Sequence, residues 1–304
     1  MYSSGAPASR VRQSLRHLLE GLCTVFFPSN CHICGLPQLN ISWVPVCTEC
    51  LEGIHPISGK VCSICGELVL SSFALPDDDG FLRCPLCRRL KRPFEQAVAY
   101  GTYDGNLREL IHLLKYNGVR PAAEVLGRML AECFDDLEPG FEQPEILVIP
   151  VPLFKAKLRQ REFNQAELIA KAAVKLRPAQ RLRFTPNVLL RTRRTESQIG
   201  LTSHQRRENL RGAFDCSQEV TGREVLLVDD VYTTGTTATE CSRVLRKAGA
   251  TKVWVATVAR TMKLASKQMI ALEPDDAISG FRAWRENAEF ERKLESEPLA
   301  TLKL

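Results

Sequence analysis

The sequence has no long hydrophobic run. Its longest apolar stretches, such as 225–228 and 146–149, are far shorter than the roughly 18 residues that a membrane-spanning helix needs. A signal peptide is not indicated either, because His17 and Glu20 interrupt the apolar centre that such a peptide requires. We therefore expect a cytoplasmic protein in which residues 1–28 form an amphipathic helix that packs on the protein itself rather than anchoring it in a membrane.

Acidic residues are scarce between Lys155 and Arg211. This segment contains fifteen Lys or Arg and four Glu, a local excess of +11 in a chain of 304 residues whose net charge is +6. Such a segment suits a polyanionic partner, either a phosphorylated metabolite or a nucleic acid, although a solvated basic face would have the same composition. Aromatic residues in and next to it are few, namely Phe154, Phe163 and Phe184, which limits base stacking.

Cysteine, in contrast, is abundant near the N-terminus. Eight of the twelve cysteines form four Cys-x-x-Cys pairs before residue 90, and each pair can present two thiolates to one metal ion. The pairs are Cys31/Cys34, Cys47/Cys50, Cys62/Cys65 and Cys84/Cys87. The pattern predicts two zinc sites of four thiolates each, with sequential pairing the simplest assignment and interleaved pairing still open.

We expect these metal sites to be structural. Four thiolates leave zinc no open position for a water molecule, so hydrolytic chemistry is not expected there. A disulfide framework would need an oxidising compartment, and a redox Cys-x-x-Cys is usually a single pair.

Apolar runs of strand length alternate with helical patterns after residue 93. Expected strands are 96–103, 146–149, 188–191, 225–229 and 253–258, and expected helices are 107–114, 122–134, 166–174 and 238–248. This alternation is typical of an α/β protein with a mostly parallel sheet flanked by helices. We expect a zinc-ribbon module over 29–92, the α/β domain over 93–260 and a tail over 261–304.

A loop after the apolar run 225–228 carries the clearest site. Asp229 and Asp230 follow this run, at the carboxyl end of a strand where open α/β sheets bind ligands. The small residues that come next let backbone N–H groups approach an anion at the start of a helix. They are Thr233, Thr234, Gly235, Thr236 and Thr237. The loop suits a phosphate and the carboxylates suit sugar hydroxyls, directly or through a divalent ion; the alternative is a plain strand-turn-helix with solvent-facing acids.

Residues 228–237 resemble the phosphoribosyl diphosphate signature of type I phosphoribosyltransferases. Further blocks extend the likeness over roughly residues 15–260, and together they resemble the ComF family. These blocks are 30–87, 110–118 with Leu114-Lys115-Tyr116, 149–152, 161–166, and 195–214 with Arg211-Gly212-Ala213-Phe214. The resemblance implies a double zinc ribbon fused to a type I phosphoribosyltransferase fold.

The same resemblance implies ligands and partners. The ligand is phosphoribosyl diphosphate with Mg²⁺, the role is DNA uptake during bacterial competence, and the partners are single-stranded DNA and a competence helicase-type protein. The implied ligand-binding residues are Asp229, Asp230, Val231, Thr233, Thr234, Gly235, Thr236 and Thr237. With a pyrophosphate loop after Ile149, the candidate contacts to pyrophosphate or nucleic acid are Lys155, Arg159, Arg161, Arg193, Arg194 and Arg206.

Glu162 departs from the family pattern, which usually has glycine at this position. We expect its carboxylate either to weaken anion binding in that loop or to pair with Arg159 or Arg161. For a general base, His112 and His204 are candidates by residue type alone.

Two functions are compatible with this sequence. One is an enzyme that transfers a phosphoribosyl group to an unidentified acceptor. The other is a DNA-handling protein that keeps the ligand site and binds single strands through its basic segment. The basic segment and the zinc module favour the second.

Overall fold

A computed structural model describes residues 29–38, 43–69, 76, 80–177, 181–195 and 203–262. The helix expected over 1–28 lies outside these residues, as does the tail beyond Met262. None of the helices in the described part has the length and apolarity required to cross a bilayer.

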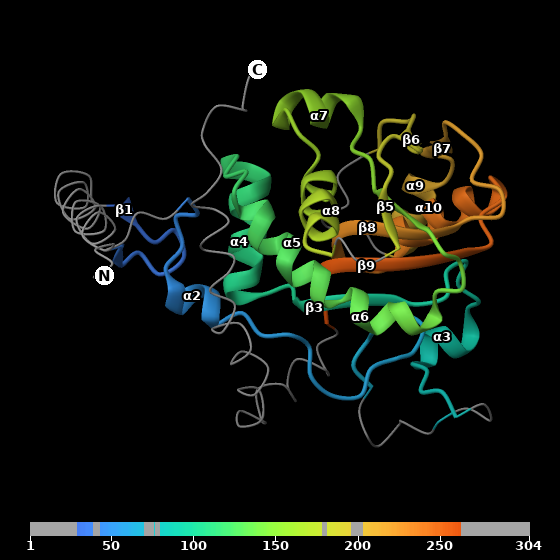
Figure 1. The fold of residues 1–304 in the computed structure, drawn as a ribbon, viewed down its shortest axis with the longest axis horizontal. Coiled ribbons are helices and arrows are strands. Elements are labelled where there is room, and N and C mark those ends of the chain that lie inside the picture. Colours follow the sequence, from blue (N-terminus) through green and yellow to red (C-terminus); the bar gives the residue numbers. More distant parts are fainter. Residues whose placement is uncertain are drawn as a thin grey trace, which may run out of the picture. The chain divides into compact units, whose positions relative to one another are not determined.

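The core of the protein is a parallel sheet of five strands in the order β3-β9-β8-β4-β5 (Figure 1). The strands are β3 (Ala97–Thr102), β4 (Ile146–Pro150), β5 (Leu182–Phe184), β8 (Glu224–Tyr232) and β9 (Lys252–Arg260). Adjacent strands are parallel at every pairing. The expected α/β class is therefore confirmed, and β8 lies in the centre, where both of its faces are covered.

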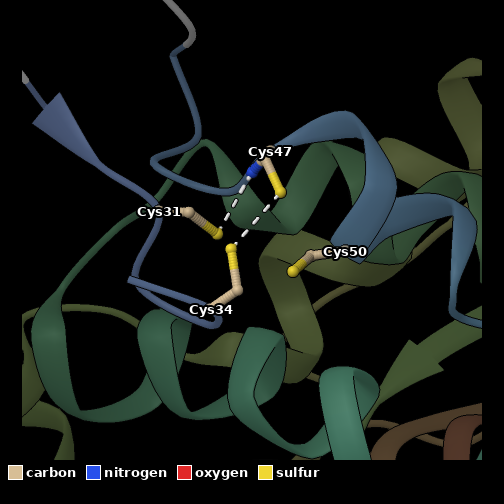
Figure 2. A group of neighbouring side chains, drawn as sticks. All are labelled: Cys31, Cys34, Cys47 and Cys50. Atoms are coloured by element: carbon tan, nitrogen blue, oxygen red, sulfur yellow. Dashed lines mark hydrogen bonds between the residues drawn. The ribbon is translucent and has the colours of Figure 1, made fainter. Parts of the chain in front are cut away.

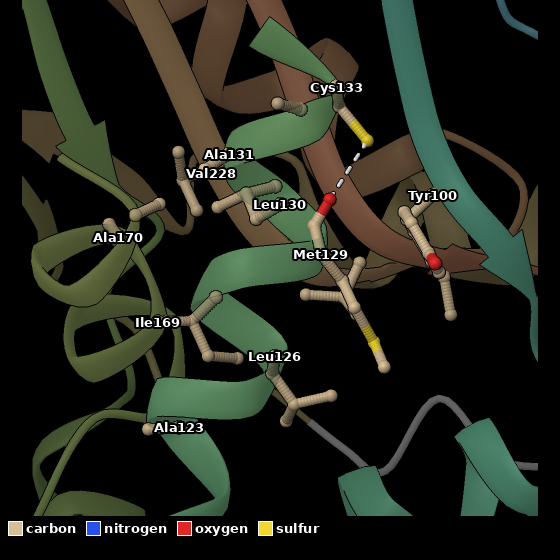
Figure 3. Packing of buried hydrophobic residues seen from close by; sticks show 14 of the residues in the cluster. Tyr100, Ala123, Leu126, Met129, Leu130, Ala131, Cys133, Ile169, Ala170 and Val228 are labelled. Atoms are coloured by element: carbon tan, nitrogen blue, oxygen red, sulfur yellow. Dashed lines mark hydrogen bonds between the residues drawn. The ribbon is translucent and has the colours of Figure 1, made fainter. Parts of the chain in front are cut away.

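Helices cover the two faces of this sheet. They are α4 (Gly105–Asn117), α5 (Ala122–Glu132), α8 (Gln165–Lys175) and α10 (Thr236–Lys247). Leu226 and Val228 of β8 belong to the hydrophobic cluster that contains α4, α5 and α8. Val225 and Leu227 belong to a second cluster with α10. Figure 3 shows part of the first cluster, in which Ile169 and Ala170 of α8 and Leu126 and Leu130 of α5 are labelled.

The cysteine-rich segment adds short elements and protects an edge of the sheet. These elements are β1 (Ser29–Asn30), β2 (Pro37–Gln38), α2 (Thr48–Glu52) and α3 (Pro85–Arg89). The backbone N–H of Ile57 donates to the carbonyl of Tyr100 at 2.7 Å, and that of Ala97 donates to the carbonyl of Ile64 at 2.8 Å. Both Tyr100 and Ala97 lie in β3, so the edge of the sheet that β9 does not cover is hydrogen-bonded by this segment.

Smaller elements complete the described chain. They are α6 (Phe134–Leu137), the 3₁₀ helix η2 (Glu138–Gly140), α7 (Lys155–Arg161), β6 (Leu189–Arg191), α9 (Ser203–Leu210) and β7 (Phe214–Cys216). Strands β6 and β7 pair antiparallel, with α9 between them in the chain.

The expected elements agree with the structure where the hydrophobic period is strong. The helix expected over 107–114 corresponds to α4, which extends to Asn117 and is capped by Gly118, with a φ of +68°. The helix expected over 122–134 ends earlier, at Glu132, and a separate turn of helix, α6, follows. Helix α7 was missed because it has no buried residue and therefore no apolar period in its sequence.

Candidate functional site

The candidate phosphate loop connects β8 to α10. Gly235 has a φ of +71° and occupies the N-cap position of α10. A Cβ atom at this position would lie 2.1 Å from the hydroxyl oxygen of Tyr232, so a side chain is excluded on steric grounds. The hydroxyl oxygens of Thr234 and Thr236 are 2.7 Å apart and hydrogen-bonded. The loop thus brings hydroxyl groups and the first amides of α10 together, as an anion site requires.

Two adjacent carboxylates at the end of β8 face opposite layers of the protein. Asp230 is buried, forms an ion pair with Lys115 of α4, and accepts a hydrogen bond of 3.4 Å from the side chain of Gln165 of α8. Asp229 is partly exposed and lines a small hollow with Leu227 and Thr237, on the α10 side. One carboxylate is therefore fixed by protein partners, whereas the other is partly exposed in the hollow beside the loop.

The pKa values of Asp229 and Lys115 are shifted toward each other. Burial raises the pKa of Asp229 to about 6, although the positive charges of Lys115 and Arg191 oppose the change. Burial also lowers the pKa of Lys115 to about 8, because the attraction of Asp229 only partly compensates and Arg161 adds repulsion. Both groups therefore carry their charges together only between about pH 6 and pH 8.

Further cations converge on these carboxylates. Partial burial and the charges of Arg161 and Arg191 lower the pKa of Lys157 on α7. Arg191, at the end of β6, stacks on Phe214 at 5.4 Å and is electrostatically coupled to Asp229. Within the described residues its buried Nε has no hydrogen-bond partner. We call Lys115, Lys157, Arg161 and Arg191 the cation cluster. Its four positive charges exceed the two negative charges of Asp229 and Asp230, so the net positive charge of the site favours binding of an anion.

An open groove adjoins the cation cluster. It lies between α7 and the end of β6 and encloses about 1150 Å³, part of it open to solvent. Its lining includes Phe154, Lys157, Gln160, Arg191 and Arg194. None of these side chains is acidic, so the groove suits a phosphate-rich ligand.

The predicted basic contacts are distributed unevenly. Arg194 lines the groove, whereas Lys155 and Arg159 are exposed on α7. Arg161 lies over the Tyr116 ring at 5.2 Å and donates to the Gln165 side chain at 3.0 Å.

Arg193 has a different environment from Arg194. It donates to the backbone carbonyls of Asn209 and Arg211, both at 2.8 Å. These bonds connect the chain that follows β6 to the chain that precedes β7. Arg206 lies in α9, and its side chain is outside the described part.

Sequence reasoning overlooked three members of the cation cluster as site residues. Lys115 appeared only within the Leu114-Lys115-Tyr116 block, and nothing in that block indicated that its ammonium group would meet Asp230. Lys157 and Arg191 were not singled out from the other basic residues of the segment. A charge count finds the segment but cannot select the side chains that point into one groove.

The predicted ion pair of Glu162 with Arg159 or Arg161 is wrong. Glu162 ends α7 in the left-handed conformation, with a φ of +65°, and its carboxylate lies 3.4 Å from the Arg120 guanidinium rather than beside Arg159 or Arg161. Because glycine adopts this conformation at least cost, the conformation itself explains a preference for glycine at this position.

Neither histidine gains support as a base. The Nε2 atom of His112 is 3.0 Å from the hydroxyl oxygen of Tyr103, and its ring makes an edge-on contact with Tyr116. Burial lowers its pKa. His204 lies in α9, and its side chain is outside the described part.

The eight paired cysteines form two tetrads with sequential pairing. In each tetrad the four sulfur atoms lie within 4.8 Å of one another. The first tetrad is Cys31, Cys34, Cys47 and Cys50 (Figure 2), and the second is Cys62, Cys65, Cys84 and Cys87. Interleaved pairing is thereby excluded.

The sulfur spacing fits zinc. Cys34 and Cys47 have sulfur atoms 3.7 Å apart, as do Cys65 and Cys84. Tetrahedral zinc with Zn–S bonds of about 2.3 Å requires about 3.8 Å between thiolates, whereas a disulfide bond is about 2.05 Å long. Burial raises the pKa of Cys31, but backbone N–H groups that donate to its sulfur outweigh this effect and bring the pKa to about 6.

Comparisons with known proteins agree with this architecture. Residues 168–279 match the phosphoribosyl transferase domain, and together with the parallel sheet this match defines a phosphoribosyltransferase-type protein that carries cysteine tetrads suited to zinc.

Similar full-length proteins place the chain in a family. It is 30% identical to DNA utilization protein YhgH of Escherichia coli O157:H7, over 77% of this chain and 98% of that protein. It is 30% identical to competence protein F of Haemophilus influenzae, over 70% and 96% respectively, and 24% identical to competence protein ComFC of Bacillus subtilis, over 67% and 79%. The chain belongs to the ComF family.

Elemental analysis of the purified protein should find close to two zinc ions per chain. Cys34→Ser and Cys84→Ser should each remove about one ion, because three thiolates and a hydroxyl hold zinc less well than four thiolates. Cys216→Ser, outside both tetrads, is the matched control and should keep both ions. A zinc content near zero in the wild type would contradict the assignment.

Proposed function

We propose that this protein binds phosphoribosyl diphosphate with Mg²⁺ and uses that site while handling single-stranded DNA. The main support for this proposal is that the cation cluster and two carboxylates lie near the loop that turns at Gly235. The eight cysteines suit metal rather than disulfides, which supports a reducing compartment such as the cytoplasm.

The ligand's chemistry can be matched to the site group by group. The loop 233–237 offers hydroxyls and helix-start amides to the 5′-phosphate. Asp229, which is partly exposed, would accept hydrogen bonds from ribose hydroxyls or hold Mg²⁺. Lys157 and Arg191, on the groove side, would meet the pyrophosphate. Mg²⁺ would offset part of the negative charge of the bound diphosphate.

A path for single-stranded DNA continues from the same site. The groove has three basic residues and no acidic residue among its lining side chains, and grooves of this kind follow a phosphate backbone. Tyr116 is 64% exposed beside Arg161 and could stack a base. Tyr116 belongs to α4 and not to the basic segment, so it adds an aromatic side chain to the few in that segment. The names of the relatives, DNA utilization protein and competence protein, support this role; a helicase-type partner stays a prediction.

The second candidate is an active phosphoribosyltransferase, favoured by the matched domain. An acceptor nucleophile would form a bond to C1 of the ribose while the bond from C1 to the pyrophosphate oxygen breaks, with the electron pair leaving on pyrophosphate. The cation cluster would stabilise that departing charge, and Asp229 would stabilise the positive charge that develops on the ribose. Pyrophosphate released only when an acceptor is present would favour this candidate.

Calorimetric titration with phosphoribosyl diphosphate and Mg²⁺ tests the ligand site. We expect binding by the wild type and a loss of at least about tenfold, or about 1.4 kcal/mol, for Asp229→Asn. Gly235→Ala should weaken binding by a similar factor, because the methyl group displaces Tyr232 and the loop. Asp215→Asn removes an exposed carboxylate from β7 and should bind normally. The absence of binding by a folded wild type would refute the ligand assignment.

The affinity for this ligand should depend on pH in a bell shape. Below about pH 6 Asp229 takes up a proton, and above about pH 8 Lys115 loses one, so the affinity should fall on both sides. Lys115→Arg should remove the alkaline limb, since arginine stays charged. Asp229→Asn should flatten the acidic limb except for the contribution of the ligand's own phosphate, which titrates near pH 6. An alkaline limb that persists in Lys115→Arg would contradict the assignment of Lys115.

Binding of a fluorescent oligo(dT) strand at several salt concentrations tests the DNA path. The affinity should fall steeply as salt rises, and Lys157→Ala or Arg194→Ala should each reduce the slope of log K against log salt by about 0.7. Tyr116→Ala should weaken binding with little change in slope, because stacking releases no counterions. Arg183→Ala removes one charge of the basic segment from strand β5 and is the control. Binding that is absent or insensitive to salt would eliminate this path.

A further inference from the structure

The second tetrad is buried completely, whereas the first is buried only in part, through Cys31 and Cys50. The four cysteines of the second tetrad share a hydrophobic cluster with Tyr232 and with α10. In the first tetrad Cys34 is exposed. The first tetrad contacts the start of α4 instead, where the side chain of Asn106 donates to the carbonyl of Cys50 at 2.9 Å. The two metal sites therefore support different parts of the protein.

Arg260 joins the second tetrad to the sheet. This last residue of β9 is only 2% exposed, which is unusual for arginine. Its guanidinium donates to the backbone carbonyl of Cys65, one of the tetrad residues, and to a carboxylate oxygen of Glu67 at 2.5 Å. A buried guanidinium needs such partners, because burial removes its hydration and an unpaired buried charge is strongly destabilising. The knuckle at Cys65 thus determines where this side chain lies.

Arg260 in turn contacts the residue that supports the phosphate loop. Its guanidinium lies 5.2 Å from the centroid of the Tyr232 ring, and the two residues are register partners on β9 and β8. The Tyr232 ring is buried against Gly235, so closely that a Cβ atom at Gly235 would overlap it. Any shift of this ring therefore changes the space available to the loop.

The knuckle has little freedom to move independently of this contact. Gly66 has a φ of +69°, and a Cβ atom there would lie 2.8 Å from the carbonyl oxygen of Ala97 and 3.2 Å from the Arg260 guanidinium. The backbone of the knuckle is also bonded to β3, because the N–H of Ala97 donates to the carbonyl of Ile64 at 2.8 Å. If the tetrad opened, Arg260 would lose both of its partners and leave the position that holds Tyr232.

We infer that Arg260 is a positioning residue that couples the second cysteine tetrad to the phosphate loop, so that metal in this tetrad, and not in the first, sets the conformation of residues 233–237. One consequence of this coupling rests on the proposed function: loss of metal from the second tetrad should lower the affinity for phosphoribosyl diphosphate. The coupling itself concerns the free protein.

Hydrogen exchange of the full-length, ligand-free protein tests the coupling. Cys84→Ser should accelerate exchange of the amides 233–237 on the order of tenfold or more, while β4 stays protected. The matched variant Cys34→Ser should leave these amides unchanged. Equal protection of the loop in Cys84→Ser, with one zinc ion lost, would overturn the inference. This readout needs no ligand, so it stands apart from a failure of the proposed function.

Arg260→Gln decides the case if Cys84→Ser does not fold. This variant should keep two zinc ions yet show the same faster exchange in the loop, and phosphoribosyl diphosphate affinity should fall on the order of tenfold. Arg260→Lys keeps the charge but can restore only some of the contacts, so it should give an intermediate rate. Loop protection that is unchanged in Arg260→Gln would show that Arg260 has only a packing role and refute the proposal.

Discussion

Successive side chains of a β-strand point to opposite faces of the sheet, and at the end of β8 this rule separates two neighbouring carboxylates. Asp230 turns toward α4 and α8, where Lys115 neutralises it, whereas Asp229 turns toward α10. Each layer of the protein must then supply its own positive charge. The cation cluster, which draws on α4, α7 and β6, follows from this division. One carboxylate is held by protein partners, and the other lines the hollow beside the loop.

Features that depend on short spacings could be predicted from the sequence. The Cys-x-x-Cys pairs define their own knuckles, so two tetrads could be predicted, with sequential pairing as the simplest assignment. The apolar run of β8 predicts that Asp229, Asp230 and the threonine loop lie at the carboxyl end of a strand, where the structure has them. The parallel order of the strands follows from their alternation with helices. In each case neighbouring residues carry the whole signal.

Features that depend on contacts between distant segments could not be predicted. Lys115 meets Asp230 only because α4 packs on the same face of the sheet. Arg193 and Arg194 look alike in the sequence, yet one binds backbone carbonyls and the other lines the groove. Glu162 met an unexpected partner because its left-handed backbone ends α7. Side-chain direction, and not residue type, decided each outcome.

The hydrogen bonds that Ile57 and Ile64 form with β3 have a consequence for the protein in a cell. An open strand at the side of a sheet is a template for pairing with other chains, and proteins usually block it. Here the blocking segment is cysteine-rich, and its two tetrads are suited to metal, on which small metal-binding modules commonly depend for folding. If this segment also folds only with metal, a newly made chain without metal would expose the β3 edge. Metal supply would then decide how much of the protein escapes aggregation, before any ligand is bound.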